Sequence, residues 1–142
     1  MPAENRPIAW IIPRRLGDAL FQTPAMRFLA ECRPELRIDV VAITQVSATV
    51  LEHAPYVHRV MVCLSDDAFK CLRGQYSRVV LGMPGQTGSR LAGLMGGEML
   101  TLSGGGPGRH VAERGVLAVK RLFGLEVECR DFNYSLYPQT NA

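Results

Sequence analysis

Short runs of apolar, often β-branched residues alternate along this chain with amphipathic stretches, and this alternation restricts the fold more than any other feature. Strands that are apolar almost throughout, each followed by a helix, are typical of a parallel sheet covered on both faces. We therefore expect an α/β fold: a Rossmann-like, doubly wound, mainly parallel sheet with helices on both faces and a switch in strand order beside the first strand. The pattern predicts strands at residues 8–12, 37–43, 59–64, 78–81 and 98–102, and helices at 23–32, 46–53, 66–73, 89–95 and 111–123.

Composition limits the classes of protein that this chain can belong to. Its 142 residues, 47% hydrophobic and 20% charged, fit one compact domain over 1–142. The net charge of +3 is too small and too scattered for a nucleic-acid interface, although it suits an anionic ligand. The N-terminal apolar run, about five residues long, is too short for a signal peptide or a membrane span, so we expect a cytoplasmic protein.

The cysteines and histidines indicate neither a metal site nor a catalytic pair. Cys32, Cys63, Cys71 and Cys129 lack CxxC spacing and lie in or beside apolar segments, which predicts buried, reduced thiols. His53, His58 and His110 are too dispersed for a metal cluster or a nucleophile and its base. We expect no metal and no cofactor.

Two further segments give local predictions. Ser65 is expected to cap the helix that begins at Asp66. Residues 132–137 alternate apolar and polar side chains before Pro138, which predicts a sixth strand or an extended arm that leaves the domain.

Charged groups follow the first strand directly, at Arg14, Arg15 and Asp18, with Gly17 between them. Open α/β sheets bind their ligands at the carboxyl ends of the strands, so these residues are candidates for a site. Arginine grips phosphate or carboxylate, and one of the two is expected to face the ligand. Gly17 is expected to allow a sharp turn. Asp18 is either a structural residue at a helix start or a catalytic carboxylate.

Thr23 and Pro24 allow two interpretations of the helix start. Thr23 caps a helix that has Pro24 at its first position, or the helix begins near Gly17 and is kinked at Pro24.

Two glycine-rich tracts, residues 82–90 and 103–110, match neither GxxxxGK[ST] nor GxGxxG, which argues against a dinucleotide or P-loop site. We interpret both as flexible loops on the ligand side of the sheet. In the first tract, Thr87, Ser89 and Arg90 lie near a helix start and are candidates for an anion contact. His110, at the start of the longest helix, is a cap or a ligand contact.

Residues 15–27, RLGDALFQTPAMR, resemble the opening motif of the ADP-heptose:lipopolysaccharide heptosyltransferases, glycosyltransferase family nine. The order of later landmarks is similar too: residues 33–41, 51–60, 76–80 and 110–114 resemble successive segments of that family's N-terminal half. The chain departs from the family after the fourth strand, where Leu81-Gly82-Met83-Pro84-Gly85 replaces an aspartate and a Gln-Gly or His-Gly turn. Its spacer between arginine and Gly-Asp is also short.

The resemblance implies the N-terminal half of a GT-B fold, which receives the acceptor, without the C-terminal domain that holds the nucleotide sugar. It implies inverting transfer with Asp18 as the base, and it agrees with Arg14 or Arg15 as an anion contact. Together with the residues singled out above, the expected acceptor contacts are Arg14, Arg15, Gly17, Thr23, Thr87, Ser89 and Arg90. The implied acceptor is a phosphorylated saccharide or lipid-linked glycan of lipopolysaccharide core or related glycan synthesis, met at the inner face of the bacterial inner membrane. Such a half would be inactive alone.

Two alternatives and two further expectations remain at this point. The same scaffold also suits a non-catalytic saccharide-binding or subunit-assembly module, or, less well, a generic nucleotide-binding flavodoxin-like domain, because no phosphate fingerprint is present. We also expect peripheral membrane contact, and self-association through an apolar face that a second domain would cover.

Overall fold

The computed structural model describes residues 6–83, 85–102, 111–129 and 132. In this part, five parallel strands form one sheet in the order β3-β2-β1-β4-β5. The strands are β1 (Ile8–Ile11), β2 (Ile38–Ala42), β3 (Arg59–Val62), β4 (Arg78–Leu81) and β5 (Glu98–Thr101). The predicted fold class and the predicted switch in strand order beside β1 are both confirmed.

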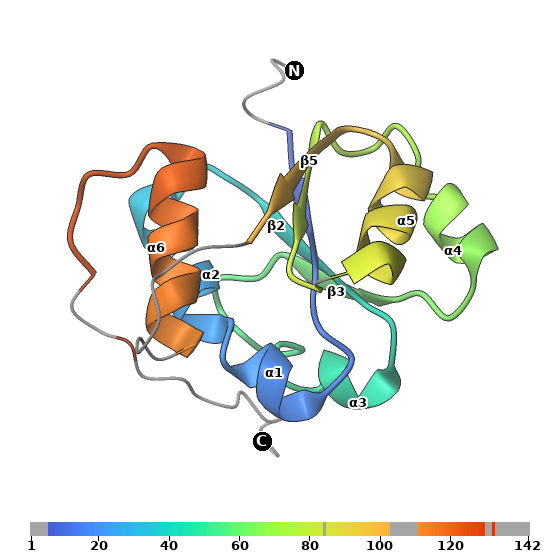
Figure 1. Ribbon diagram of the computed structural model, residues 1–142, viewed down its shortest axis with the longest axis horizontal. Helices are drawn as coiled ribbons and strands as arrows, with labels where there is room; N and C mark the ends of the chain where they lie inside the picture. The colour runs from blue at the N-terminus through green and yellow to red at the C-terminus, as the bar shows by residue number, and fades with distance from the viewer. Residues whose placement is uncertain (1–5, 84, 103–110, 130–131, 133–142) are drawn as a thin grey trace.

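The helices are α1 (Leu16–Leu20), α2 (Thr23–Cys32), α3 (Gln45–Ala48), α4 (Asp66–Lys70), α5 (Gly85–Met95) and α6 (Val111–Phe123). Figure 1 shows α2 and α6 together on one face of the sheet and α4 and α5 together on the other. Successive residues of β1 divide between these layers: Trp10 packs with the α2–α6 side and Ile11 with the α4–α5 side. The sheet therefore has an apolar core on each face, as a parallel sheet requires.

The predicted elements at 23–32, 78–81 and 111–123 have the bounds that the structure shows for α2, β4 and α6. Helix α3 is shorter than the predicted helix 46–53, because after Ala48 the chain continues in i→i−3 turns, in which the Leu51 N–H donates to the Ala48 carbonyl. Helix α4 ends at Lys70 for the same reason, followed by Gly74 at φ +85°. Ser65 caps α4 as predicted, its hydroxyl accepting a hydrogen bond from the Ala68 N–H.

The first glycine-rich tract is not a loop throughout, which corrects our interpretation. Helix α5 begins at Gly85 and includes residues 85–90 of the tract. Gly88 is buried, and a Cβ there would collide with the Met83 carbonyl oxygen. Glycine is therefore needed at this position so that the helix can pack closely. A glycine-rich composition alone does not tell such a helix from a flexible loop.

The junction at Thr23 and Pro24 matches neither of the two interpretations fully. A separate one-turn helix, α1, covers Leu16–Leu20. Two turn residues, Phe21 and Gln22, separate it from α2. Gln22, not Thr23, is the N-cap residue, and Pro24 occupies the first turn of α2, where its missing N–H costs nothing. The tract 103–110 with His110, and residues 133–137 of the predicted sixth strand, lie outside the described residues.

Candidate functional site

The switch in strand order lies between β1 and β4, which are adjacent in the sheet while their following segments diverge. Helix α1 follows β1 at this edge, and α5 follows β4. In Figure 1, the chain descends through β1 and reaches α1 at the lower edge of the molecule, beside α3. Parallel sheets bind ligands at the carboxyl ends of the strands beside such a switch. We call this end of the sheet the carboxyl edge, and we expect the candidate site residues from the sequence to lie there.

Four of the candidates lie together here. Arg14, Arg15, Gly17 and Asp18 lie within five consecutive residues, and all four are exposed. Asp18 lies in the only turn of α1. The N-cap residue of α1 is Arg15, whose side chain makes no capping hydrogen bond. Among the described residues, the side chains of Arg14, Arg15 and Asp18 have no polar partner. These charged groups are thus free to meet a solute.

The position of α1 is fixed by a chain of side-chain hydrogen bonds that the sequence analysis missed. The indole N–H of Trp10 donates to Gln22 Oε1 over 2.9 Å, and Gln22 Nε2 donates to the Gly82 carbonyl over 2.6 Å. The Gly82 N–H in turn donates to the Ile11 carbonyl. Gln22 therefore ties the junction of α1 and α2 to the end of β4. The signal in the sequence is Trp10 within an apolar strand, because a buried tryptophan needs a hydrogen-bond acceptor for its indole N–H.

Gly82 is required by the same arrangement. A Cβ at this position would collide with Gln22 Oε1 and would lie 2.6 Å from the Ile11 carbonyl oxygen. Glycine at residue 82 therefore has a packing reason in this chain.

The expected role of Gly17 in a sharp turn is wrong. Gly17 has no positive φ, and a Cβ added to it meets nothing within 4 Å. The chain bends instead at Arg14 and Arg15, and the Arg14 carbonyl accepts a hydrogen bond from the Thr44 hydroxyl over 3.2 Å. Nothing in the packing of the fold requires glycine at residue 17, which leaves its exposed backbone open to a ligand.

The remaining candidates are placed less favourably for contact with an acceptor. Thr23 is buried and its hydroxyl donates to the Leu20 carbonyl over 2.8 Å, which gives it a structural role at the junction of α1 and α2. Thr87 and Ser89 are exposed on α5, one turn from the carboxyl edge. Arg90 is engaged by Asp66 of α4, with 2.7 Å between Nη1 and Oδ2.

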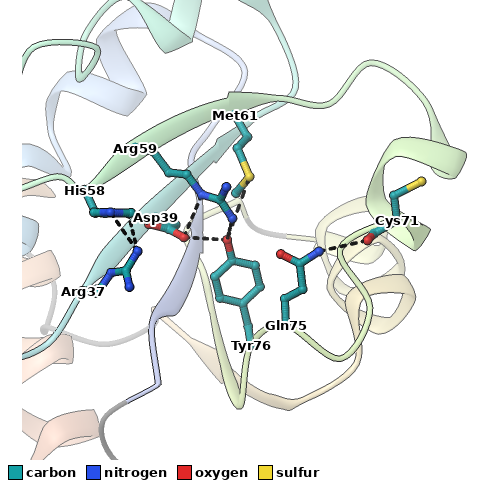
Figure 2. A network of polar contacts seen from close by, with 8 residues as sticks. All are labelled: Arg37, Asp39, His58, Arg59, Met61, Cys71, Gln75 and Tyr76. Carbon is teal, nitrogen blue, oxygen red and sulfur yellow. Dashed lines mark hydrogen bonds and ion pairs between the residues drawn. The ribbon is translucent and has the colours of Figure 1, made fainter. Parts of the chain in front are cut away.

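A second polar cluster lies at the opposite end of the strands, and Figure 2 shows it. Asp39, the second residue of β2, is only 1% exposed, and its carboxylate accepts hydrogen bonds from three side chains. The donors are the Tyr76 hydroxyl at 2.7 Å, Arg59 Nε at 3.0 Å and His58 Nδ1 at 2.9 Å. His58 Nε2 faces Arg37 at 2.8 Å. Because Asp39 accepts and Arg37 donates, His58 carries its proton on Nδ1.

This cluster is an internal brace and not part of the carboxyl edge. It links β2, β3 and the segment before β4 through a carboxylate whose partners are all satisfied. Asp39 is not among the candidates from the sequence, although a lone aspartate within an apolar strand is a signal that a buried partner exists.

The ionisation of Tyr76 gives the brace a measurable pH dependence. Burial, together with the hydrogen bond to Asp39, raises the pKa of Tyr76 to about 12 from its ordinary value near 10. The protonated hydroxyl stabilises the fold fully below the unfolded-state pKa, and this contribution is lost as the pH rises to the folded-state pKa. We expect about 2 to 3 kcal/mol of unfolding free energy to disappear between about pH 10 and 12. In Tyr76→Phe this decrease in unfolding free energy between about pH 10 and 12 should vanish. Urea unfolding at a series of pH values measures it, and an equal decrease in the two proteins would contradict the role of Tyr76.

The other signals for a site are negative or lie elsewhere. Of the four cysteines, Cys63 is buried, which raises its thiol pKa, Cys32 and Cys129 are half-buried, and Cys71 is exposed, so the prediction of buried thiols is wrong for Cys71. None of the four cysteines forms a disulfide within the part of the chain that the structure describes. No three His, Cys, Asp or Glu side chains within the described ranges are arranged to hold a metal ion. No helix in the described part of the chain is long and apolar enough to cross a membrane.

A groove of about 510 Å³ lies away from Asp18, between α2 and the segment after α6. Its lining residues are Arg27, Phe28, Glu31, Cys32, Val127, Glu128 and Cys129. None of the candidate residues contributes to it. We therefore place the candidate site on the open carboxyl edge, where the unpartnered charges are, and not in this groove.

No protein-family model matches the sequence, and no curated protein matches it significantly. Solved structures do match the fold. A family 9 glycosyltransferase from Veillonella parvula DSM 2008 superposes with a TM-score of 0.71 at 18% identity, covering 98% of this chain and 46% of that one. The E. coli heptosyltransferase WaaC with ADP gives 0.70 at 17% identity, covering 95% and 49%. WaaC with ADP-2-deoxy-2-fluoro heptose gives 0.60 at 15%, covering 89% and 51%.

The chain thus spans about half the length of these solved proteins. The resemblance to heptosyltransferases that the motifs indicate is confirmed for the fold, and it is confirmed as a resemblance to one half of such a chain. The identities are low, so the likeness concerns the scaffold.

Proposed function

We propose that this chain is the acceptor-binding half of a heptosyltransferase-like, inverting glycosyltransferase, with Asp18 as the general base. The observation that carries the proposal is an exposed carboxylate that has no polar partner in the described part of the chain and lies at the switch point of a sheet whose fold matches this class. In the proposed reaction, Asp18 takes the proton of an acceptor hydroxyl while the hydroxyl oxygen attacks the anomeric carbon. The bond from that carbon to the nucleoside diphosphate breaks, and the configuration inverts.

The surroundings of Asp18 support a phosphorylated saccharide as acceptor. Arg14 and Arg15 precede it, are exposed, and present guanidinium groups that bind phosphate through paired N–H donors. Thr87 and Ser89 on α5 add exposed hydroxyls near the neighbouring strand. We propose these four residues and the Gly17 backbone as acceptor contacts, and Thr23 as a residue that positions α1.

The proposal assigns the site for the leaving diphosphate to a second, nucleotide-sugar-binding half. The chain alone is therefore expected to bind the acceptor without catalysing transfer. Micromolar binding of ADP-heptose to the isolated chain by calorimetry would count against this division of labour.

Gly17 offers a direct test of acceptor binding. In Gly17→Ala the added methyl group meets no protein atom, and the helix gains about 0.5 to 1 kcal/mol from the better helix former. If a saccharide packs on this backbone, the methyl group displaces it, and we expect about tenfold weaker binding of a phosphorylated inner-core oligosaccharide, which is about 1.4 kcal/mol. Isothermal titration calorimetry measures both the affinity and its dependence on the phosphate, by comparison with the dephosphorylated sugar.

The matched control is Gly93→Ala. Gly93 is also an exposed helical glycine with open space around its Cα, but it lies in α5 beyond Arg90. This variant should bind the oligosaccharide as the wild type does. Equal affinities for all three proteins would remove Gly17 from the site, and no binding by the wild type would refute the acceptor-binding role.

A non-catalytic saccharide-binding or assembly module is the second candidate function. It is favoured by the same exposed arginines, which bind an anion whether or not chemistry follows. The two candidates differ in what they require of Asp18.

A further inference from the structure

Gln22 belongs to the end of α1 and to the start of α2 at once. Its backbone N–H donates to the Ala19 carbonyl over 3.1 Å, which closes the last turn of α1. Its carbonyl accepts from the Met26 N–H over 3.1 Å, in the first turn of α2. The position of Gln22 therefore sets where the helix that carries Asp18 stops and where the next helix begins.

Helix α1 is held mainly at its two ends. It is five residues long, and Ala19 is the one residue of α1 that is buried. A helix of this length has no stability of its own in water, so its place depends on what holds it. Before α1, the Thr44 hydroxyl donates to the Arg14 carbonyl over 3.2 Å. After α1, the tie is the Gln22 side chain, and Asp18 lies between these two anchors.

The Gln22 amide lies between two groups that need opposite hydrogen-bonding partners. The Trp10 indole N–H can only donate, and it donates to Oε1 over 2.9 Å. The Gly82 carbonyl can only accept, and it accepts from Nε2 over 2.6 Å. Trp10 and Gly82 are both buried, so loss of the amide would leave two buried polar groups unpaired.

This amide bridges the two strands at the switch point. Trp10 is in β1 and Gly82 directly follows β4, and β1 and β4 are neighbours in the sheet. Beyond Gly82 the chain enters α5, which carries the exposed hydroxyls proposed above as acceptor contacts. Gln22 thus fixes the spacing between the helix that carries Asp18 and the strand end that leads to those hydroxyls.

We propose that Gln22 is a positioning residue for sugar transfer: through α1 it holds Asp18 where the carboxylate reaches the acceptor hydroxyl. The inference deepens the proposed function and rests on Asp18 being the general base. A base acts only within hydrogen-bond reach of the proton that it takes, and a displacement of about 1 Å costs about 10²-fold in rate. Gln22 acts through α1 and not by contact with the substrate.

The two ends of α1 serve different steps of the reaction. Arg14 and Arg15, the proposed anion contacts, precede α1 at the end that Thr44 anchors. Removal of the Gln22 tie should therefore displace Asp18 and leave the arginines in place. We expect a lower kcat with little change in KM, the result of losing an interaction that matters only in the transition state.

Gln22→Met tests this expectation, because methionine keeps the length of the side chain and removes both polar atoms. Transfer is measured with the nucleotide-sugar-binding half as a separate polypeptide and a phosphorylated inner-core oligosaccharide as acceptor. The kcat should fall about 10- to 100-fold, and KM for the oligosaccharide should stay within about twofold of the wild-type value.

The matched control is Gln75→Met. Gln75 Nε2 also donates to a backbone carbonyl, that of Cys71 at 3.2 Å, but Gln75 precedes β4 and so lies at the other end of the strands. This variant makes the same chemical change and should leave both kcat and KM at their wild-type values.

Gln22→Glu restores the link by protonation. As a carboxylate, the new side chain accepts from Trp10 but repels the Gly82 carbonyl. As a neutral acid, it donates an O–H to Gly82 and accepts from Trp10, as the amide does. Partial burial beside a carbonyl favours the neutral acid, so kcat relative to wild type should rise at least about threefold between about pH 8 and 5. Gln22→Met should show no such recovery.

Two measurements on the chain alone show whether α1 has loosened. The backbone amide hydrogens of Ala19 and Phe21, which bond within α1, should exchange at least about tenfold faster in Gln22→Met, while those of α6 keep the wild-type rate. Trp10 is the chain's single tryptophan, so its fluorescence emission should change in Gln22→Met and not in Gln75→Met.

A wild-type kcat in Gln22→Met, a loss expressed in KM alone, or an equal loss in Gln75→Met would each overturn the positioning role. Equally faster exchange in α1 and α6 would do the same, because the whole fold would then be weakened. So would the absence of recovery in Gln22→Glu. If Gln22→Met does not fold, Gln22→Glu at the higher pH takes its place, because it keeps the bond to Trp10.

Asp18→Asn, measured alongside, separates this inference from the proposed function. A slow Asp18→Asn together with a wild-type rate in Gln22→Met refutes the positioning role alone. A wild-type rate in Asp18→Asn, or no transfer by the wild-type chain, refutes the proposed function and the positioning role with it.

Discussion

Replacing Asp18 with asparagine is expected to lower the rate of sugar transfer by about 10² to 10⁴-fold, the usual contribution of a general base. The amide has nearly the shape of the carboxylate but cannot take the proton of the acceptor hydroxyl. Because Asp18 is exposed and has no polar partner among the described residues, the substitution breaks no contact of the fold. Stability and oligosaccharide affinity should therefore stay close to the wild-type values. Transfer is measured with the chain supplied together with a nucleotide-sugar-binding half as a separate polypeptide.

Asp67→Asn is the matched control for this experiment. Asp67 is also an exposed aspartate in the first turn of a short helix that begins at the carboxyl edge, but it follows β3 instead of β1. Its substitution should leave the transfer rate unchanged. An Asp18→Asn protein that transfers sugar at the wild-type rate would refute the catalytic assignment and favour the non-catalytic module. A protein that loses acceptor affinity together with the rate would make Asp18 a binding residue.

The largest effect on stability is expected for Asp39→Asn, at about 3 kcal/mol of unfolding free energy. The Asp39 carboxylate accepts from Tyr76, Arg59 and His58 while almost fully buried. An amide at this position offers one oxygen, so one of the three donors faces an N–H₂ group or is left without an acceptor. Arg59 and His58 are about half exposed and regain water, which holds the cost at the lower end of the range for buried ion pairs. Urea unfolding at neutral pH measures this difference.

Asp66→Asn isolates the contribution of burial. Asp66 and Arg90 form an aspartate–arginine pair as short as that of Asp39 and Arg59, at 2.7 Å against 3.0 Å, but both of its side chains are more than half exposed. Exposed pairs contribute about 0.2 to 1 kcal/mol, so this variant should lose less than about 1 kcal/mol. Similar losses in the two variants would show that the Asp39 cluster is not the buried brace described above.

The sequence predicted correctly those helices, strands and caps that depend only on residues close together in the chain. Helix α6 has a regular apolar period over thirteen residues, and β4 is a short apolar run between turns, so both were found with their observed bounds. Ser65 was recognised as a cap because capping depends on residues within one turn. By contrast, α3 and α4 end where the chain tightens into i→i−3 turns, and no residue type in the sequence enforces those points.

The candidate site was predicted in part for the same reason. Arg14, Arg15 and Asp18 are adjacent in sequence, and any fold that begins with an apolar strand and continues with a helix places them at one edge. The residues that hold them there are distant: Gln22 and Gly82 are sixty positions apart, and Thr44 and Arg14 thirty. The role of Gly17 in a turn was also wrong, because a glycine in a sequence does not reveal whether its φ is positive.

The sequence by itself determined that this chain is an alternating α/β domain with charged residues directly after its first strand. The spacing of apolar residues and the order of residue types are local properties, so both can be seen in the sequence. Only the tertiary structure decided the strand order, the brace around Asp39, and the link from Trp10 through Gln22 to Gly82. Each of these depends on which strands become neighbours and in what register. That choice is made by burial of the whole core and by right-handed crossovers between parallel strands, neither of which any single segment specifies.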